Sequence, residues 1–472
     1  MSPRVQTSST ASVGAPSRDR LEDHLEFLPP GDPVGVIASG SLPEKEAIQP
    51  RGFGVRSSWT RRILTFLMVF GPGLIVMVAD NDAGAVSTYT QAGAQYGLHL
   101  MWLLVFLLPV TFFVQEMVAR LGIATGKGHA AMIFERFGRF WGIFSLTDLL
   151  VLNFLTLVTE FAAINLAFSM MGISPYVAVP TAAVALIILV VTGSYRRWER
   201  MTIFLCLLDL AWLGLAIHSG VSAGGIPRAT LVPSLPAGGL SSDFIFLVIA
   251  VVGTTIAPWQ LFFQQSCVAD KRLRFKDLRM ERIDTFIGAV IVIVVAGCMM
   301  LVGYAAHLAG LNYTNPAQMA HFLGQVWGPV ARNAILLLMV NAAILGATAI
   351  SLSSAWAWGE VKGWRHSLNL KFREAPGFYL AYAVIVCLAA ALVLIPRAPL
   401  QLIILSVQVL AGLMLPSAII FLNLLLNDKQ LLPKQFLNKR WNNIVNWTII
   451  VILFGLSVML AVQVVIPNLL SS

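Results

Sequence analysis

Two aspartates and an asparagine interrupt an apolar stretch early in the chain. The segment VADNDAGA covers residues 78–85, between the apolar runs ILTFLMVFGPGLIVM and VSTYTQAGAQYGLHLMWLLVFLL. A charged side chain at bilayer depth costs at least about 2.5–3.5 kcal/mol on insertion scales, so carboxylates at that depth usually mark a functional site. Asp80 and Asp82 are therefore candidate ligands for a cation that would offset this cost.

A second apolar segment is interrupted in a different way. The run FIFLVIAVVGTTIAPWQLFFQQ covers residues 244–265. Pro258 lacks a backbone N–H and clashes with the preceding helical turn, so a helix here must break. Non-helical backbone at membrane depth persists only where it is buried in protein or lines a wet cavity. Thr255 and Ala257 therefore lie where freed backbone carbonyls can join the carboxylates at an ion, although two ordinary kinks without a ligand are the alternative.

Other polar residues in the apolar segments differ in their sequence neighbours. Glu160 in LVTEFAAIN has no cationic neighbour in the sequence, so we expect it at the site, with a protonated structural carboxyl as the alternative. Gln408 in LSVQVLAG is expected to offer an amide oxygen to the same cavity. Glu116 precedes Arg120 by four residues, which is the spacing of a structural ion pair on a helix. Asp148 and Asp209 are expected to be buried hydrogen-bond partners, with a part in gating as the alternative.

The elements that must position these residues are transmembrane helices. Apolar residues make up 57% of the 472 residues and charged residues 12%, with a mean hydropathy of +0.78. Soluble domains carry about 25% charged residues. The long runs suit helices of about 20 residues and lack the alternation of a membrane β-barrel. We predict eleven spans, near 62–97, 98–120, 140–171, 174–193, 201–219, 243–269, 285–308, 330–358, 377–396, 399–426 and 444–467.

The distribution of basic residues predicts the orientation. With a cytoplasmic N-terminus, all but three of the 32 Lys and Arg residues fall on the cytoplasmic side, the exceptions being Arg228, Arg332 and Arg397. This asymmetry is the positive-inside rule, so the net charge of +9 reflects topology and not a nucleic-acid partner. We therefore expect a multi-pass protein of the plasma membrane with its C-terminus outside. The four cysteines, in four different spans, have neither metal-ligand nor disulfide spacing.

The positions of the two interruptions predict the domain organisation. They fall in spans one and six, as expected for two inverted repeats of five helices with an ion site at their interface. We predict repeats at about 59–220 and 240–426 within a core of 59–426, followed by a loop and an eleventh helix in 427–472. Residues 1–58, rich in Ser, Pro and charge, are expected to form a disordered cytoplasmic tail.

These residues resemble the NRAMP metal-ion transporters. GPGLIVMVADNDAGAVSTYTQAGAQYG (71–97) looks like the family's first helix, with its GPG, eight residues, DPGN and QAGAQ-type tail. GTTIAPWQLFFQQS (253–266) resembles the sixth helix, G-A-T-V-M-P-H-N-L, and Gln408 with Pro416 resembles the family's Gln and Pro in the tenth. The resemblance runs from about residue 60 to 425. It implies the all-α LeuT-type fold, with a metal ion between broken helices one and six.

The departures from the family pattern indicate a particular branch. Asp82 matches the family's aspartate, but Ala85 replaces its asparagine ligand, and an extra Asp80 precedes it. Ala257 replaces the methionine ligand, and Trp259 replaces the histidine after the proline. In the third helix, the family's pattern Asp-Leu-Ala-Glu corresponds to Glu160-Phe-Ala-Ala163 of this chain, so the second acid of the pattern is missing here. This combination is similar to the NRAMP-related magnesium transporters.

The resemblance and these departures together imply a function. Thioether sulfur favours softer ions, whereas carboxylate, carbonyl and water suit Mg²⁺ and Mn²⁺. Mg²⁺ keeps several waters and uses one or two carboxylates, so the loss of direct ligands at Ala85 and Ala257 suits a hydrated ion. We expect Asp82 and Glu160 to supply the charges, Thr255 a hydroxyl or carbonyl, and Asp80 a contact through water. Without the histidine and the second acid, import without proton coupling is expected.

The sequence leaves three alternative functions open. A proton-coupled Mn²⁺/Fe²⁺ symporter of the ordinary NRAMP type is the nearest, and a sodium-coupled amino-acid symporter of the same fold is the second. The third is an intramembrane aspartyl protease using Asp80 or Asp82. The GxGD context of such proteases is missing, as are GxSxG, HExxH and phosphate-loop motifs, so we expect no enzyme. Divalent ions and lipid are the only expected partners, with no cofactor and no obligate protein partner.

Overall fold

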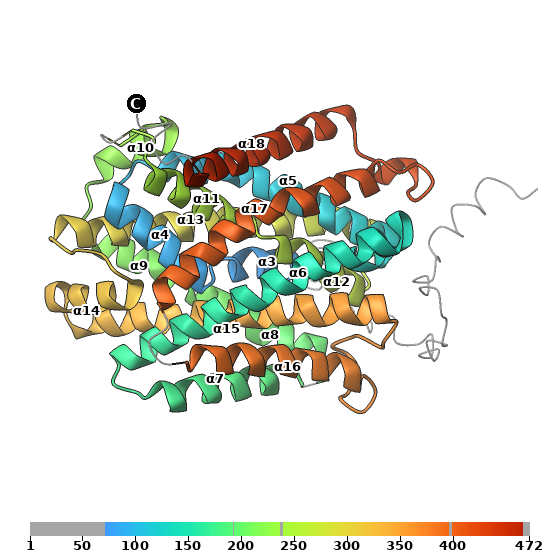
Figure 1. Cartoon of the computed structure of the whole chain (residues 1–472), viewed down its shortest axis with the longest axis horizontal. Helices are drawn as coiled ribbons and strands as arrows, with labels where there is room; N and C mark the ends of the chain where they lie inside the picture. The colour runs from blue at the N-terminus through green and yellow to red at the C-terminus, as the bar shows by residue number, and fades with distance from the viewer. Residues whose placement is uncertain (1–70, 192, 237–238, 396–398, 466–472) are drawn as a thin grey trace, which may run out of the picture.

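The computed structural model describes residues 71–191, 193–236, 239–395 and 399–465 (Figure 1), and within these ranges the regular elements are all helices. The predicted tail, 1–58, lies outside the described residues. The α-helices are α3 Pro72–Ala79, α4 Ala83–Tyr96, α5 Met101–Thr125, α6 His129–Met170, α7 Pro175–Val190, α8 Tyr195–Leu208, α9 Ala211–His218, α10 Ile226–Leu231, α11 Ser242–Thr255, α12 Pro258–Asp270, α13 Leu278–Leu308, α14 Pro316–Trp327, α15 Pro329–Lys362, α16 Pro376–Val393, α17 Leu400–Leu426 and α18 Arg440–Val465.

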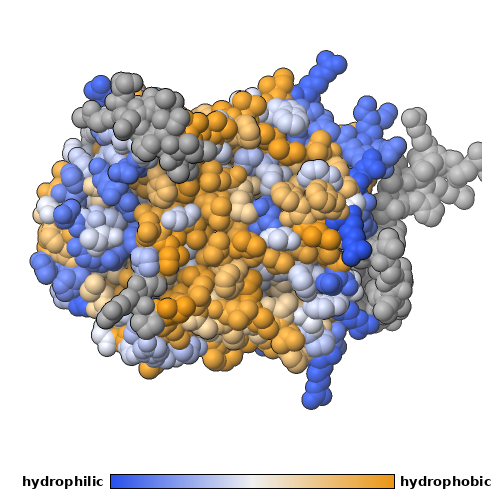
Figure 2. Space-filling model, in the orientation of Figure 1, coloured by the Kyte–Doolittle hydropathy of each residue, from blue (hydrophilic) through white to orange (hydrophobic). Residues whose placement is uncertain are grey.

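Most of the predicted spans appear as long apolar helices. Nine helical segments of the described chain are long and apolar enough to cross a bilayer, counting α8 with α9 and α11 with α12 as single segments. The helix α7 is apolar but has only 16 residues, and the first span is described from residue 71 as the two short helices α3 and α4. Figure 2 shows a broad hydrophobic band between two more polar ends, as expected for a protein that crosses a membrane. The number of crossings stays a prediction.

The first predicted break separates α3 from α4. Pro72 stands in the first turn of α3, where its missing N–H costs nothing. The helix ends at Ala79, and Asp82 then adopts an extended conformation with φ −69° and ψ −173°. Its carboxylate accepts a hydrogen bond from the Ala85 backbone nitrogen at 2.9 Å, which makes Asp82 the N-cap of α4. The polar residues at the break therefore start the second half-helix.

The second predicted break separates α11 from α12. Ile256 and Ala257 are extended, with φ/ψ of −140°/90° and −95°/145°, and Pro258 begins α12. Because proline has no N–H, the carbonyl of Thr254 lacks the donor that an unbroken helix would place four residues later. Both interruptions read from the sequence are thus real breaks in the helices.

Three features were not predicted. The third span belongs to a 42-residue element, α6, that bends at Gly138, where φ is 83°. The fifth span is divided into α8 and α9 at Asp209 and Leu210. The amphipathic helix α14, Pro316–Trp327, lies between two predicted spans. Asn315 and Pro316 are typical of a helix start, but at 12 residues α14 is shorter than a membrane span, and the predicted helices were identified by that length.

The broken helices lie in the interior of the bundle. Figure 1 shows α3 and α4 surrounded by longer helices, and every residue of α3 is buried. The helix α13 packs along both α3 and α4. At Gly93 and Gly303 an added Cβ would overlap a backbone carbonyl of the facing helix, Met300 and Thr90 respectively, so α4 and α13 touch through their backbones. Such small-residue contacts are typical of membrane helix pairs.

Candidate functional site

Asp82 and Glu160 meet at the break between α3 and α4. Glu160 Oε2 accepts a hydrogen bond from the backbone nitrogen of Ala83 at 3.0 Å. Both side chains are buried, with 2% exposure for Asp82 and none for Glu160. Glu160 Oε1 has no hydrogen-bond partner among the described residues. The two acids belong to different predicted spans, and the fold brings both carboxylates to the backbone at the start of α4.

Gly346 of α15 forms the floor under these two carboxylates. A Cβ added at this glycine would lie 2.6 Å from Asp82 Cβ and 3.0 Å from both Glu160 Cδ and Oε2. Any side chain at this position must therefore displace one of the acids. The short distances also establish that Asp82 and Glu160 approach the same point on α15.

Asp80 lies on the other side of the break. It caps the C-terminal end of α3 and is 1% exposed, yet neither of its carboxylate oxygens has a hydrogen-bond partner in the described structure. It interacts electrostatically with Asp82 and lies beside the side chain of Gln260. An unpaired buried carboxylate is costly, so these oxygens are available to a cation or to its water.

Thr255 connects the two broken helices. Its Oγ1 donates to the carbonyl of Val251 at 2.5 Å and lies 2.8 Å from the hydroxyl of Tyr89 in α4. With its own proton already donated, Thr255 is the acceptor from Tyr89. Thr255 is thus held at the site by two partners, and its hydroxyl keeps one further lone pair.

The two remaining predicted site residues line the same region. Ala257 lies in the break before Pro258 and is 3% exposed. Gln408 of α17 lies against Gly84, where an added Cβ would overlap its amide. Gln408 Nε2 has no hydrogen-bond partner in the described chain. All six predicted site residues are therefore buried at or beside one of the two breaks.

The sequence reading missed two glutamines, Gln260 beside Asp80 and Gln115 in contact with Gln260. Gln115 of α5 donates through Nε2 to Gln260 Oε1 at 2.8 Å, and both residues are fully buried. Gln115 Oε1 and Gln260 Nε2 remain without partners among the described residues. Neither amide carries a charge, so attention to ionisable residues passed over them, although a glutamine inside an apolar run was a signal that could have been used.

The donor set at the breaks is small and rich in oxygen. Within the described ranges, no three His, Cys, Asp or Glu side chains gather closely enough to hold a metal ion by themselves. Asp82 and Glu160 instead combine two carboxylates with the neutral oxygens at the two breaks. This composition suits a hard divalent cation that keeps part of its hydration shell.

The residues predicted to be structural have the expected contacts. Arg120 Nε lies 3.3 Å from Glu116 Oε1, and Arg282 joins the same carboxylate at 2.7 Å. Asp148 accepts from Ser417 Oγ at 3.0 Å, and Asp209 accepts from Asn341 Nδ2 at 2.7 Å. The predicted ion pair is confirmed, and both aspartates accept hydrogen bonds as predicted. Asp209 is buried as expected, whereas Asp148 is only half-buried, and a gating role for either aspartate stays a prediction.

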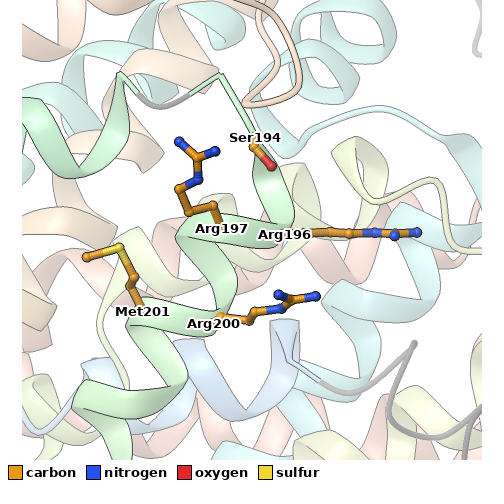
Figure 3. A pocket seen from close by; sticks show the side chains of 5 residues that line it. All are labelled: Ser194, Arg196, Arg197, Arg200 and Met201. Atoms are coloured by element: carbon orange, nitrogen blue, oxygen red, sulfur yellow. The ribbon is translucent and has the colours of Figure 1, made fainter.

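A hollow at the start of α8 has a different character. It has a volume of about 460 Å³ and is lined by Ser194, Arg196, Arg197, Arg200 and Met201. Figure 3 shows Arg196 and Arg200 extending to one side of α8 and Arg197 to another. Its positive charge repels cations, so this hollow does not compete with the helix breaks as an ion site.

Sequence comparison gives two findings. A family model described as "Natural resistance-associated macrophage protein-like" (Nramp) matches residues 73–463. The chain is also 26% identical over 442 residues to the divalent metal cation transporter MntH of Staphylococcus aureus, covering 87% of this chain and 94% of that protein. Both matches extend well beyond the two broken helices, so they concern the whole bundle.

Structure comparison supports the predicted LeuT-type fold. A manganese transporter from Eremococcus coleocola superposes with a TM-score of 0.70 at 19% identity, covering 86% of this chain and 88% of that one. MhsT, solved with L-phenylalanine, superposes with a TM-score of 0.55 at 15% identity, covering 82% and 98%. The match covers most of all three chains, so the whole architecture is shared.

Proposed function

Because this chain belongs to the Nramp family, we propose that it imports Mg²⁺, and also Mn²⁺, across the plasma membrane by alternating access and without proton coupling. Membership of this family and the similarity to MntH make the chain a multi-pass membrane transporter of divalent metal cations. This is a family of membrane transporters and not of enzymes, which removes the protease alternative. The choice of ion and the absence of coupling are the proposal.

One observation carries the choice of ion. Asp82 and Glu160 form a pair of buried carboxylates at the α3–α4 break, and Ala257 stands in the second break where the family pattern has a methionine. A thioether would favour softer ions, whereas a set of oxygen ligands alone suits Mg²⁺. Tyr89 and Thr255 fix the two half-helices relative to each other, so the oxygens are held in place before an ion arrives.

The proposal of uncoupled import rests on missing titratable groups. Trp259 and Ala163 occupy the places where the family pattern has a histidine and an acid. Under this proposal, the cation is driven by its own gradient and by the membrane potential. The potential contributes about 2.3 kcal/mol per charge per 100 mV, and therefore twice that for a divalent ion.

Proton-coupled Mn²⁺ import is the second candidate, and one observation favours it. Asp209 is fully buried at the division between α8 and α9, and its Oδ2 has no hydrogen-bond partner in the described structure. A buried acid with a free oxygen could carry a proton in place of the missing groups. The structural neighbour that is a manganese transporter also points to this ion.

Uptake into proteoliposomes separates the two candidates. The purified chain is reconstituted and given Mg²⁺ or Mn²⁺ outside, with a pH-sensitive dye inside and a potassium gradient to set the potential. Mg²⁺ entry that follows the potential without acidification supports the proposal. Mn²⁺ entry with acidification and no Mg²⁺ entry supports the coupled alternative.

A further inference from the structure

A second group of unpaired buried oxygens lies between α3, α12 and α13. It consists of Glu281 and Asp284 in the first turns of α13 and Gln264 in α12, none of which is exposed to solvent. The group lies toward the end of the bundle that carries the basic loops 271–277, 363–375 and 427–439, which we call the basic end. By the orientation predicted from those loops, this is the cytoplasmic side of the first site.

Each of these three side chains makes at least one hydrogen bond and also has one oxygen without a partner. Gln264 Nε2 donates to Glu281 Oε1 at 3.4 Å and to Thr285 Oγ1 at 3.1 Å. Asp284 Oδ2 accepts from the backbone nitrogens of Gly71 at 3.0 Å and Gly73 at 2.8 Å. Glu281 Oε2, Asp284 Oδ1 and Gln264 Oε1 have no partner among the described residues.

The charges around this group leave it negative. Lys271 Nζ pairs with Glu199 at 2.6 Å, and Arg196 and Arg200 also interact with Glu199. These three cations therefore act on a third carboxylate, that of Glu199, and Figure 3 shows that Arg196 and Arg200 extend to the same side of α8. Lys271 acts on Glu281 and Asp284 at longer range, but neither acid has an ion pair within 4.0 Å in the described ranges.

A line of amides connects this group to the first site. Gln260 lies one helical turn before Gln264 on the same face of α12, and its side chain lies beside the Asp80 carboxylate. Gln115 supports Gln260 from α5 at 2.8 Å. Polar oxygen atoms therefore continue from the α3–α4 break to the start of α13, through a region that is otherwise apolar core.

We propose that Glu281, Asp284 and Gln264 form a second cation site, which a partly hydrated divalent cation occupies between the first site and the basic end. The proposal rests on the proposed transport of divalent cations. Two carboxylates and an amide oxygen with water are a donor set that Mg²⁺ or Mn²⁺ accepts. An arriving cation would satisfy the three unpaired oxygens together and offset the cost of burying two acids that have no ion pair of their own.

Helix capping alone does not account for the group. Asp284 caps the start of α3, but this uses only Oδ2 and requires neither Glu281 nor Gln264. A cap would be served by a single acid, and the second carboxylate beside it raises the cost of both. A cation between them resolves this repulsion.

Equilibrium binding of Mn²⁺ to the full chain in detergent tests the proposal, since free Mn²⁺ can be counted by electron paramagnetic resonance. Wild type is expected to bind two ions and Asp82→Asn one. Adding Glu281→Gln to Asp82→Asn should remove the remaining ion. Glu360→Gln in the Asp82→Asn background is the matched control, because Glu360 is another buried acid at the basic end with an unpaired oxygen, and one ion should remain.

Two outcomes would overturn the second site: no bound ion in Asp82→Asn, or an ion that survives Glu281→Gln. If the Glu281→Gln protein does not fold, Gln264→Leu takes its place and should weaken the remaining ion by at least about tenfold, the effect of one lost ligand to a buried charge. Failure of the proposed function is separate, because it is read from wild-type uptake. Normal uptake with one bound ion removes only the second site.

Discussion

The hydroxyl of Tyr89 lies 2.8 Å from Thr255 Oγ1, so one hydrogen bond joins the two broken helices of this bundle directly. Thr255 donates its own proton to Val251, which makes Tyr89 the donor. The last turn of α11 is thereby fixed against the first turns of α4, which begins at Asp82. The relative position of the two half-helices, and with it the spacing of the proposed ligands, depends on this contact.

Tyr89→Phe removes this hydrogen bond and little else. A buried hydrogen bond contributes about 0.5–1.5 kcal/mol net, so we expect the apparent affinity for Mg²⁺ to fall roughly twofold to tenfold. Initial rates of Mg²⁺ uptake against concentration measure this. Tyr382→Phe is the control, because Tyr382 is equally buried and donates to Leu186 in another part of the bundle. Equal affinities in wild type and Tyr89→Phe would contradict the positioning role.

Asp82→Asn and Glu160→Gln each remove one charge from the proposed ligand pair. A hydrogen bond or ligand contact to a charged group contributes about 1.5–3 kcal/mol, so each variant should lower Mg²⁺ uptake at limiting concentration by at least about tenfold. Asp209→Asn is the comparison, since Asp209 is a buried acid between α8 and α9 and belongs to neither break. Under uncoupled import its uptake should equal that of wild type. A loss in Asp209→Asn as severe as in Asp82→Asn would favour the coupled candidate.

Gly346→Ala tests the floor beneath the two acids. The added Cβ would lie 2.6 Å from Asp82 Cβ and 3.0 Å from the Glu160 carboxyl, so one of them must move. We expect weaker Mg²⁺ binding, measured by titration calorimetry, with the protein still folded and monodisperse. Gly214→Ala in α9 serves as control, because its Cβ meets nothing within 4 Å. Unchanged Mg²⁺ binding in Gly346→Ala would show that the ion lies elsewhere.

Ala257→Met restores a thioether in the second break. Sulfur favours softer ions, so binding of Cd²⁺ should strengthen while Mg²⁺ uptake falls as the side chain fills space needed for water. Ala257→Leu adds a side chain of similar volume without sulfur. It should lower Mg²⁺ uptake without any gain in Cd²⁺ binding. If the two variants gain Cd²⁺ binding equally, or neither gains it, the sulfur argument is wrong.

Much of this architecture could be read from the sequence because its strongest signals are local. Pro258 and the VADNDAGA segment interrupt runs that hydropathy defines clearly, and both became breaks. A local feature also distinguished the role of Glu116 from that of Glu160, because only Glu116 has an arginine, Arg120, four residues away. The structure confirms that ion pair, although Arg282, distant in sequence, supplies the shorter contact.

The parts that sequence reading missed depend on contacts between distant residues. Gln115 and Gln260 meet across two helices, and Asp284 binds the backbone of Gly71, the residue before α3, which lies 213 residues earlier. The spacing of residues along a single sequence does not indicate which distant residues will form such pairs. The division between α8 and α9 at Asp209 was missed because the segment carries neither proline nor a glycine at the break. The roles of the six proposed site residues, and the two repeats, stay predictions.

Mg²⁺ uptake into proteoliposomes, followed together with internal pH, tests the central claim most directly. The account predicts that Mg²⁺ enters in proportion to the imposed membrane potential, that the internal pH stays constant, and that Asp82→Asn abolishes the signal. Acidification that accompanies entry with a fixed ratio of protons to ions, or uptake of Mn²⁺ with none of Mg²⁺, would contradict it.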